Sequence, residues 1–196
     1  MSFGALILLF VGSALINNFI LSRFLGICAF LGVSRRLDTA LGMGAAVVFV
    51  MTCSALISWA IQRYLLTPFK LQFLEYVIFI LVIATFVQLL EMVIKKYSPS
   101  LYEAFGIYLP LITTNCSILG VALLVAGSSY NLLQTLVFAV GSGLGWTLAI
   151  VMMAGLREEL DFADVPLSLQ GSSLSLLIAA IMSLAFAGFA GVVPNL

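Results

Sequence analysis

Histidine is absent from this sequence of 196 residues, only three residues are cysteine, and 8% are charged. The absence of histidine excludes catalysis or metal ligation by an imidazole ring. The formal net charge is zero, so nothing indicates a nucleic-acid partner. Three cysteines in apolar surroundings are not typical of a secreted disulfide framework, and we expect free thiols or ligands. Any chemistry must therefore come from thiols, carboxylates or bound partners.

Hydrophobic residues make up 63% of the chain and the mean hydropathy is +1.25, whereas soluble domains contain about 45–50% apolar residues. A soluble core of this size could not hide so much apolar surface. The long runs with few charges have the length of bilayer spans, about 20 residues each. We therefore expect an integral membrane protein. Its first apolar run is expected to be retained, because the N-terminal part of the sequence lacks the basic region and the small-residue cleavage site of a signal peptide.

Six apolar runs alternate with short polar dividers, which predicts an all-α membrane protein with six transmembrane segments in a single domain, residues 1–196. Strands are not expected, because the runs lack the alternation typical of an outer-membrane barrel. The runs are Phe3–Val33, Thr39–Ile61, Tyr76–Ile94, Ala104–Ala126, Leu132–Leu156 and Ser172–Val193. The dividers are 34–38, 63–70, 95–100, 127–129 and 157–171.

The first and fourth runs are expected to be broken. The first is longer than one span needs and contains the polar residues Asn17-Asn18 and Arg23. The fourth is interrupted by Pro110 and by Thr113-Thr114-Asn115, directly before Cys116. A broken helix leaves backbone groups unpaired, which lipid does not tolerate. Both breaks are therefore expected to face protein or a cavity.

Two short strings occur twice in the chain. C-x-x-L-G-V begins at Cys28 and again at Cys116, and A-x-G-x-G recurs in the second and fifth runs. This indicates a duplication, with repeats at about residues 1–97 and 98–196. Each repeat holds three segments, an odd number, so the second must enter the membrane inverted relative to the first. The two cysteines then approach from opposite faces and can meet only near mid-depth.

Basic residues concentrate in the odd-numbered dividers. Since cytoplasmic loops carry the excess of lysine and arginine, this asymmetry predicts that both termini lie on the outer side of the membrane. The basic residues of the odd dividers are Arg35, Arg36, Lys95, Lys96 and Arg157, against Arg63 and Lys70 in the second divider.

The repeated C-x-x-L-G-V string allows two interpretations. In one, Gly32 and Gly120 permit close helix approach and the cysteines are small apolar fillers. In the other, Cys28 and Cys116 are ligands of a metal or iron–sulfur site, which needs two more ligands from another subunit. Two functions are open at this point. One is a redox subunit, and the other is a small inverted-repeat secondary transporter without a cluster. The thiol pair favours the redox subunit, because a transporter needs polar midplane ligands and the runs offer few.

The two motifs lie within a wider match. Together with the order and length of the apolar runs, the matching segments resemble the RnfA/NqrE family. Its members are membrane subunits of the Rnf electron-transport complex and of the sodium-pumping NADH:quinone reductase. Gly32 and Thr114 favour the Rnf branch, as does Asn17-Asn18. The segments are Asn17-Asn18-Phe19, Phe24–Ser34, Leu109–Cys116, Arg157-Glu158 and Ala163–Pro166.

The resemblance implies a multi-pass protein of the bacterial cytoplasmic (inner) membrane. Cys28 and Cys116 would match the family's cluster cysteines, which join two from a homologous RnfE-like subunit in holding one intramembrane [2Fe-2S] cluster. That cluster would relay electrons across the membrane of a ferredoxin/NAD complex coupled to Na+ or H+ translocation. Subunits similar to RnfB, RnfC, RnfD and RnfG are further expected partners, and this chain alone is expected to be non-catalytic.

Three remaining features are expected to be structural. Cys53 has no counterpart in the second repeat and is interpreted as a buried thiol. The glycines of the A-x-G-x-G strings suit helix packing. The acidic stretch 157–164 is expected to be a solvated connector, and a contact there with a soluble electron-donating subunit is the less favoured alternative.

Overall fold

The computed structural model describes residues 3–69, 72–97, 109–128, 130–162, 166 and 171–191. All regular structure in these ranges is helical, which confirms the all-α prediction for this part of the chain. The elements of the first half are α1 (Phe3–Val11), η1 (Gly12–Ile16), α2 (Ile27–Val33), α3 (Leu37–Ile61), η2 (Gln62–Leu66), α4 (Thr67–Phe69), η3 (Gln72–Leu74) and α5 (Glu75–Tyr97). The second half contains α7 (Leu109–Thr113), α8 (Cys116–Gly127), α9 (Leu132–Leu160), α10 (Ser172–Ala187) and η4 (Gly188–Gly191).

Four helical segments of the described ranges are long and apolar enough to cross a membrane. They are Leu37–Phe69, Glu75–Tyr97, Pro110–Gly127 and Leu132–Leu160. Two shorter apolar helices, Gly4–Ile16 and Ser172–Ala187, lie in the first and last apolar runs. Long apolar helices satisfy their backbone hydrogen bonds internally, which is the condition for crossing lipid.

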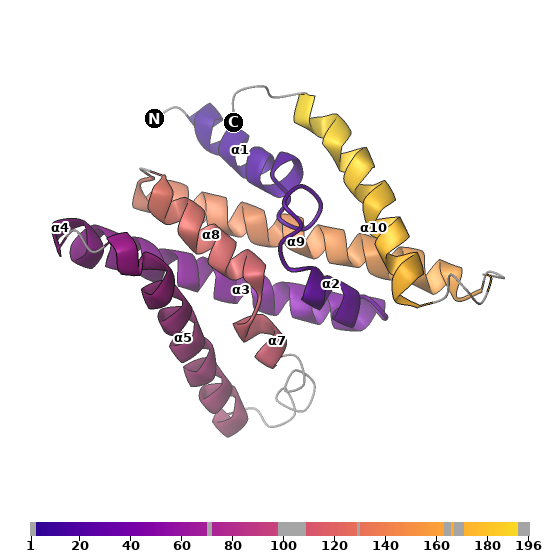
Figure 1. Cartoon of the computed structure of the whole chain (residues 1–196), viewed down its shortest axis with the longest axis horizontal. Helices are drawn as coiled ribbons and strands as arrows, with labels where there is room; N and C mark the ends of the chain where they lie inside the picture. The colour runs from indigo at the N-terminus through magenta and orange to yellow at the C-terminus, as the bar shows by residue number, and fades with distance from the viewer. Residues whose placement is uncertain are drawn as a thin grey trace.

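The long helices α3 and α9 run side by side through the centre of the molecule (Figure 1). They are antiparallel, because Gly44 of α3 faces Thr147 while Val48 faces Gly143 of α9. A Cβ atom added to Gly143 would lie 3.0 Å from the Val48 Cα atom. Small residues at a helix interface allow this close approach, and van der Waals packing drives association in lipid. The packing role expected for these glycines is confirmed at both positions.

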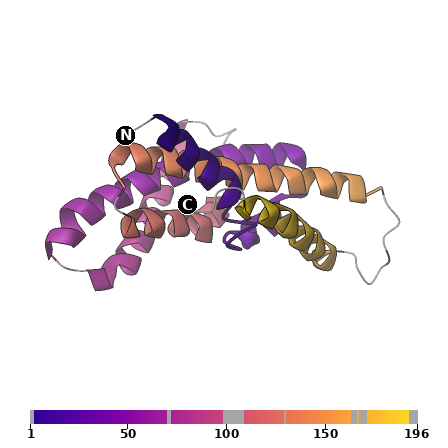
Figure 2. The same ribbon diagram turned by 90° about the horizontal axis from the view of Figure 1, so that it is seen from above.

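Large buried side chains fill the space around this helix pair. Trp146 and Met43 have no exposed surface, and neither has Phe19 of the first break. The outer helix α5 buries one stripe at four-residue spacing and turns the rest of its surface outward. Its exposed apolar residues are Val77, Ile80, Leu81, Leu89, Met92 and Val93. Figure 2 shows α5 and α10 at the periphery of the bundle, where such surface suits contact with lipid.

Two dividers differ from the sequence expectation. Helical structure continues through 63–69 as η2 and α4, because the chain widens into a π-turn in which Thr67 N donates to Gln62 O. The helix α9 likewise extends to Leu160, so the stretch 157–164 does not begin as a loop. Its first two side chains bind groups inside the chain. Arg157 is half-buried and departs from the expected solvated connector, whereas Glu158 is exposed, as expected, and accepts a hydrogen bond from Leu37 N.

Candidate functional site

The first apolar run is broken between η1 and α2, as expected. Asn18, which is 1% exposed, replaces the missing helical hydrogen bonds. Its Oδ1 atom accepts from Ile20 N at 3.1 Å and from Leu21 N at 3.4 Å. Its Nδ2 atom donates to Gly145 O of α9 at 2.7 Å. One asparagine therefore satisfies backbone groups of the break and fixes the break to the central helix pair.

Gly26 ends this break and precedes α2 in a left-handed conformation, with φ of +84°. A Cβ atom at this position would lie 2.9 Å from both Asn115 Oδ1 and Trp146 Nε1, and it would also collide with Ser117 Oγ. Both the backbone conformation and the close approach therefore require glycine. Phe24, two residues earlier, has φ of +56° and is 58% exposed.

The fourth run is broken between α7 and α8. Asn115 has extended backbone and caps α8, because its Oδ1 atom accepts from Ser117 N at 3.0 Å. The Ser117 hydroxyl donates to Leu25 O at 2.8 Å. This hydrogen bond joins the start of α8 to the residue that precedes Gly26. The two breaks, 92 positions apart in the sequence, therefore meet in the folded chain.

The predicted ligands lie on the first turns of the two helices that leave these breaks. Cys28 is the second residue of α2, Cys116 is the first residue of α8, and both are exposed. The Cys116 thiol donates to Thr114 O at 3.9 Å. The first turn of a helix presents unpaired N–H groups and favours negative charge, such as that of a thiolate. Cys53 lies elsewhere, partly buried on α3.

The thiols suit iron, but they supply only part of a ligand set. An iron–sulfur cluster is ordinarily held by four thiolates. Within the described ranges, no group of three or more cysteine, histidine, aspartate or glutamate side chains is placed to hold a metal ion. A metal centre at Cys28 and Cys116 would therefore need ligands from outside this part of the chain.

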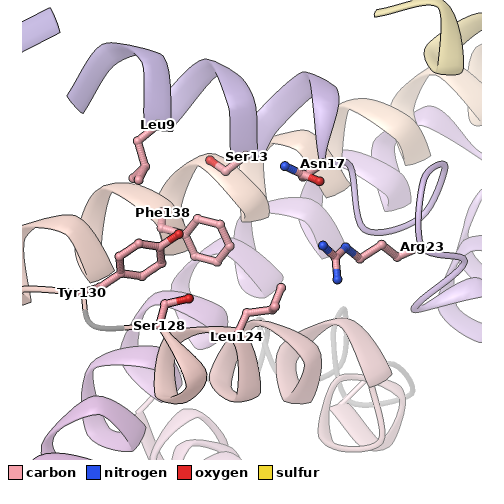
Figure 3. A pocket seen from close by; sticks show the side chains of 8 residues that line it. All are labelled: Leu9, Ser13, Asn17, Arg23, Leu124, Ser128, Tyr130 and Phe138. Carbon is pink, nitrogen blue, oxygen red and sulfur yellow. The ribbon is translucent and has the colours of Figure 1, made fainter. Parts of the chain in front are cut away.

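A cavity of about 130 Å³ lies beside the first break, between η1, α8 and the start of α9 (Figure 3). Arg23 and Asn17 line it from the break. Ser13, Ser128 and Tyr130 add hydroxyl groups, while apolar side chains complete the wall. Asn17 and Asn18 thus have different surroundings, because one borders the cavity and the other is buried against α9.

Several residues of this region were missed by sequence reasoning. The sequence pattern indicates Asn18 only as part of a polar pair and predicts no role for Gly26, Ser117 or Trp146. The glycine before a C-x-x-L-G-V string and the serine after Cys116 are weak signals when read alone. Their importance depends on a contact between segments that are far apart in the sequence.

Comparison with known proteins gives one family for nearly the whole chain. Residues 6–193 match the family described as "Rnf-Nqr subunit, membrane protein". The chain is 52% identical over 190 residues to the A subunit of the ion-translocating oxidoreductase complex of Syntrophotalea carbinolica, covering 97% of this chain and 98% of the relative.

Two further relatives have more specific names. Identity is 53% to the A subunit of the Na(+)-translocating ferredoxin:NAD(+) oxidoreductase complex of Acetobacterium woodii, covering 95% of this chain and 97% of the relative. It is 50% to the A subunit of the proton-translocating ferredoxin:NAD(+) oxidoreductase complex of Clostridium ljungdahlii, covering 94% and 96%. The resemblance drawn from the sequence motifs is confirmed. The chain belongs to the Rnf-Nqr family of multi-pass membrane subunits, and its relatives within that family are named as the A subunits of ion-translocating oxidoreductase complexes.

Proposed function

We propose that this chain is the RnfA component of an Rnf-type ferredoxin:NAD oxidoreductase complex and holds half of an intramembrane [2Fe-2S] cluster. Cys28 and Cys116 supply two of the four thiolates, and a homologous RnfE-like subunit supplies the other two. When bound, the cluster carries single electrons between the two sides of the membrane. Subunits similar to RnfB, RnfC, RnfD and RnfG would complete the complex.

One observation carries this proposal: two exposed thiols stand on the first turns of the two helices that leave the joined breaks. Breaks of transmembrane helices are costly in lipid and are tolerated where they are buried in protein or line a cavity. If both cysteines were packing residues, as in the alternative interpretation, burial would be their usual state. Exposure at matching positions instead suits ligands that meet a partner subunit.

The order of the elements supports a six-span inverted repeat. The first repeat would consist of the broken span α1–α2 followed by α3 and α5, and the second of α7–α8 followed by α9 and α10. An inverted pair shares a site at the interface of its repeats. With six spans both termini would lie on the same side of the bacterial inner membrane, and the excess of basic residues in the odd-numbered dividers favours the outer side. Reporter fusions at each terminus test it, and a cytoplasmic signal from either would contradict it.

The residues around the breaks have roles that need no cofactor. Asn18 and Asn115 satisfy backbone N–H groups, and the Ser117 hydroxyl holds the two breaks together. The N–H groups at the starts of α2 and α8 favour negative charge on Cys28 and Cys116.

The relatives differ in the ion that their names specify. The Acetobacterium woodii relative is named for Na+ and the Clostridium ljungdahlii relative for protons, at similar identity to this chain. The proposal therefore specifies electron transfer coupled to translocation of Na+ or H+. Ion uptake by vesicles that contain the complete complex, measured with and without Na+, would distinguish the two.

The experiment is electron paramagnetic resonance on the reduced, intact complex with serine variants of each cysteine. Cys28→Ser and Cys116→Ser should each lose the [2Fe-2S] signal of the membrane arm. Cys53→Ser, a matched control on α3, should keep it. The opposite pattern would contradict the assignment. An active, intact complex without this cluster would favour the alternative, a small secondary transporter of inverted-repeat type.

A further inference from the structure

Two adjacent residues of α9 bind the chain on either side of the connection between α2 and α3. Arg157 Nη1 donates to Leu31 O, in the last turn of α2, at 3.1 Å. Glu158 Oε1 accepts from Leu37 N, the first residue of α3, at 3.0 Å. The partners are separated by more than 120 positions in the sequence. The Arg157-Glu158 pair therefore satisfies one carbonyl at the end of α2 and one N–H at the start of α3.

Arg157 also reaches a third helix. Its Nη2 atom donates to the hydroxyl of Ser175 in the first turn of α10, and Ser175 in turn donates to Gly171 O at 3.0 Å. Ser175 is 4% exposed, so this contact is inside the protein. The planar guanidinium group offers several donors in a fixed geometry, which suits a residue that joins three elements. One side chain thus connects α9 to both α2 and α10.

The helix that Arg157 contacts depends on such support. α2 has seven residues, no side-chain cap at Gly26, and a length far below that of a helix stable in isolation. A cation at a helix C-terminus also interacts favourably with the helix dipole. Thr39 Oγ1 adds a longer bond of 3.4 Å to Val33 O. The last turn of α2 is therefore held from outside, while its first turn carries Cys28.

We propose that Arg157 is a positioning residue for Cys28: through the Leu31 carbonyl it fixes α2, and thereby the direction in which the Cys28 thiol is presented. Glu158 assists from the α3 side of the same connection. The inference rests on the proposed function, because a change in the position of Cys28 is measured through the properties of the shared cluster. Neither residue contacts the thiol, so the effect is transmitted along the helix.

The test uses the intact complex with Arg157→Gln, Arg157→Lys and Glu158→Gln. Arg157→Gln should shift the g values and the midpoint potential of the Cys28–Cys116 cluster. Arg157→Lys should shift them less, because a lysine retains the charge and can still donate to Leu31 O but loses the planar fork that also reaches Ser175. Glu158→Gln should give a small shift in the same signal. If Arg157→Gln does not assemble, the lysine and Glu158 variants decide the question by the same readout.

Glu159→Gln and Lys96→Gln are the matched controls. Glu159 is exposed and adjacent to the pair, and Lys96 is an exposed cation at the end of α5. Both variants should have the spectrum and potential of the unmodified complex. Equal amounts of assembled complex with unchanged spectrum and potential in all three Arg157 and Glu158 variants would overturn the inference.

A second readout is independent of any cluster. In a chain with Cys53→Ser and Cys116→Ser, Cys28 is the single thiol, and its rate of reaction with a maleimide in detergent reports the position of α2. Arg157→Gln should change that rate, whereas Glu159→Gln should not. Unchanged labelling would overturn the positioning role. If the intact complex contains no cluster, the proposed function fails, and the labelling result still decides whether Arg157 positions Cys28.

Discussion

The helices α2 and α8 begin with closely similar sequences but are held in different ways. Both contain C-x-x-L-G-V, yet α2 has seven residues and α8 has twelve. Asn115 caps α8 through its own side chain, whereas Gly26 leaves α2 without a side-chain cap. α2 instead depends on residues of α8 and α9, namely Ser117 and Arg157.

This difference indicates that the duplicated motif specifies the position of a thiol and not the way its helix is stabilised. A twelve-residue helix with a side-chain cap carries much of its own stability. A seven-residue helix must obtain it from tertiary contacts. Substitutions of distant contact residues should therefore destabilise α2, whereas substitution of the cap residue Asn115 should destabilise α8.

Gly26→Ala should have the largest effect. The substitution places a side chain in a left-handed conformation and drives its Cβ atom into Asn115, Ser117 and Trp146. Strain and overpacking together should destabilise the protein by about 4 kcal/mol. The measurement is thermal unfolding of the purified complex in detergent, together with the amount of this chain in the membrane. Unfolding at the temperature of the unmodified complex would refute the tight packing at the junction of the breaks.

Asn18→Ala should rank second. It removes the donor to Gly145 O and the acceptor for two backbone N–H groups, all in a buried setting. Unsatisfied buried groups cost about 1–3 kcal/mol, so we expect a loss of about 2 kcal/mol in the same unfolding assay. Asn17→Ala is the matched control, since Asn17 borders the cavity and should change stability little. Equal losses for the two variants would contradict the separate roles of this pair.

Asn115→Ala, at the break between α7 and α8, should destabilise the protein less than Asn18→Ala does. The variant loses the cap hydrogen bond to Ser117 N, which is worth about 1 kcal/mol. Asn115→Asp retains an acceptor and should restore most of that stability. A loss from Asn115→Ala as large as that from Asn18→Ala would mean that α8 depends on tertiary contacts as strongly as α2 does.

The glycines of the repeated string should show the smallest effects. A Cβ atom on Gly120 of α8 would lie 2.8 Å from the flexible Leu25 side chain, whereas on Gly32 of α2 the nearest atom is 3.7 Å away. Alanine also favours a helix over glycine by up to about 1 kcal/mol. Gly32→Ala should therefore be neutral or stabilising and Gly120→Ala slightly destabilising, as measured by unfolding temperature. The reverse order would contradict the packing described for the two strings.

The sequence was sufficient to predict features that depend on local composition. The apolar runs, the two breaks and the packing role of Gly44 and Gly143 follow from residue type and order, and the fold contains them. The predicted ends of α9 and of the helical segment through η2 are wrong, because the charges of Arg157 and Arg63 favour a helix end in the sequence pattern. Charged residues can continue a helix where partners inside the chain, or a π-turn, accommodate them.

The contacts that organise the candidate site were not predictable in this way. Ser117 meets Leu25, Asn18 meets Gly145 and Arg157 meets Leu31 over separations of 92 to 127 positions. Periodicity and turn signals describe neighbours along the chain, and they carry no information about such pairs. The internal repeat indicated only that Cys28 and Cys116 occupy matching places, and the ligand role of the thiols stays a prediction.

Iron content tests the central claim most directly. The complete complex is purified with the unmodified chain and with its double variant Cys28→Ser/Cys116→Ser, and iron and acid-labile sulfide are measured per complex. We expect the double variant to lack about two iron atoms and two sulfides, the content of one [2Fe-2S] cluster. Equal iron and sulfide in the two preparations, at equal assembly, would contradict it.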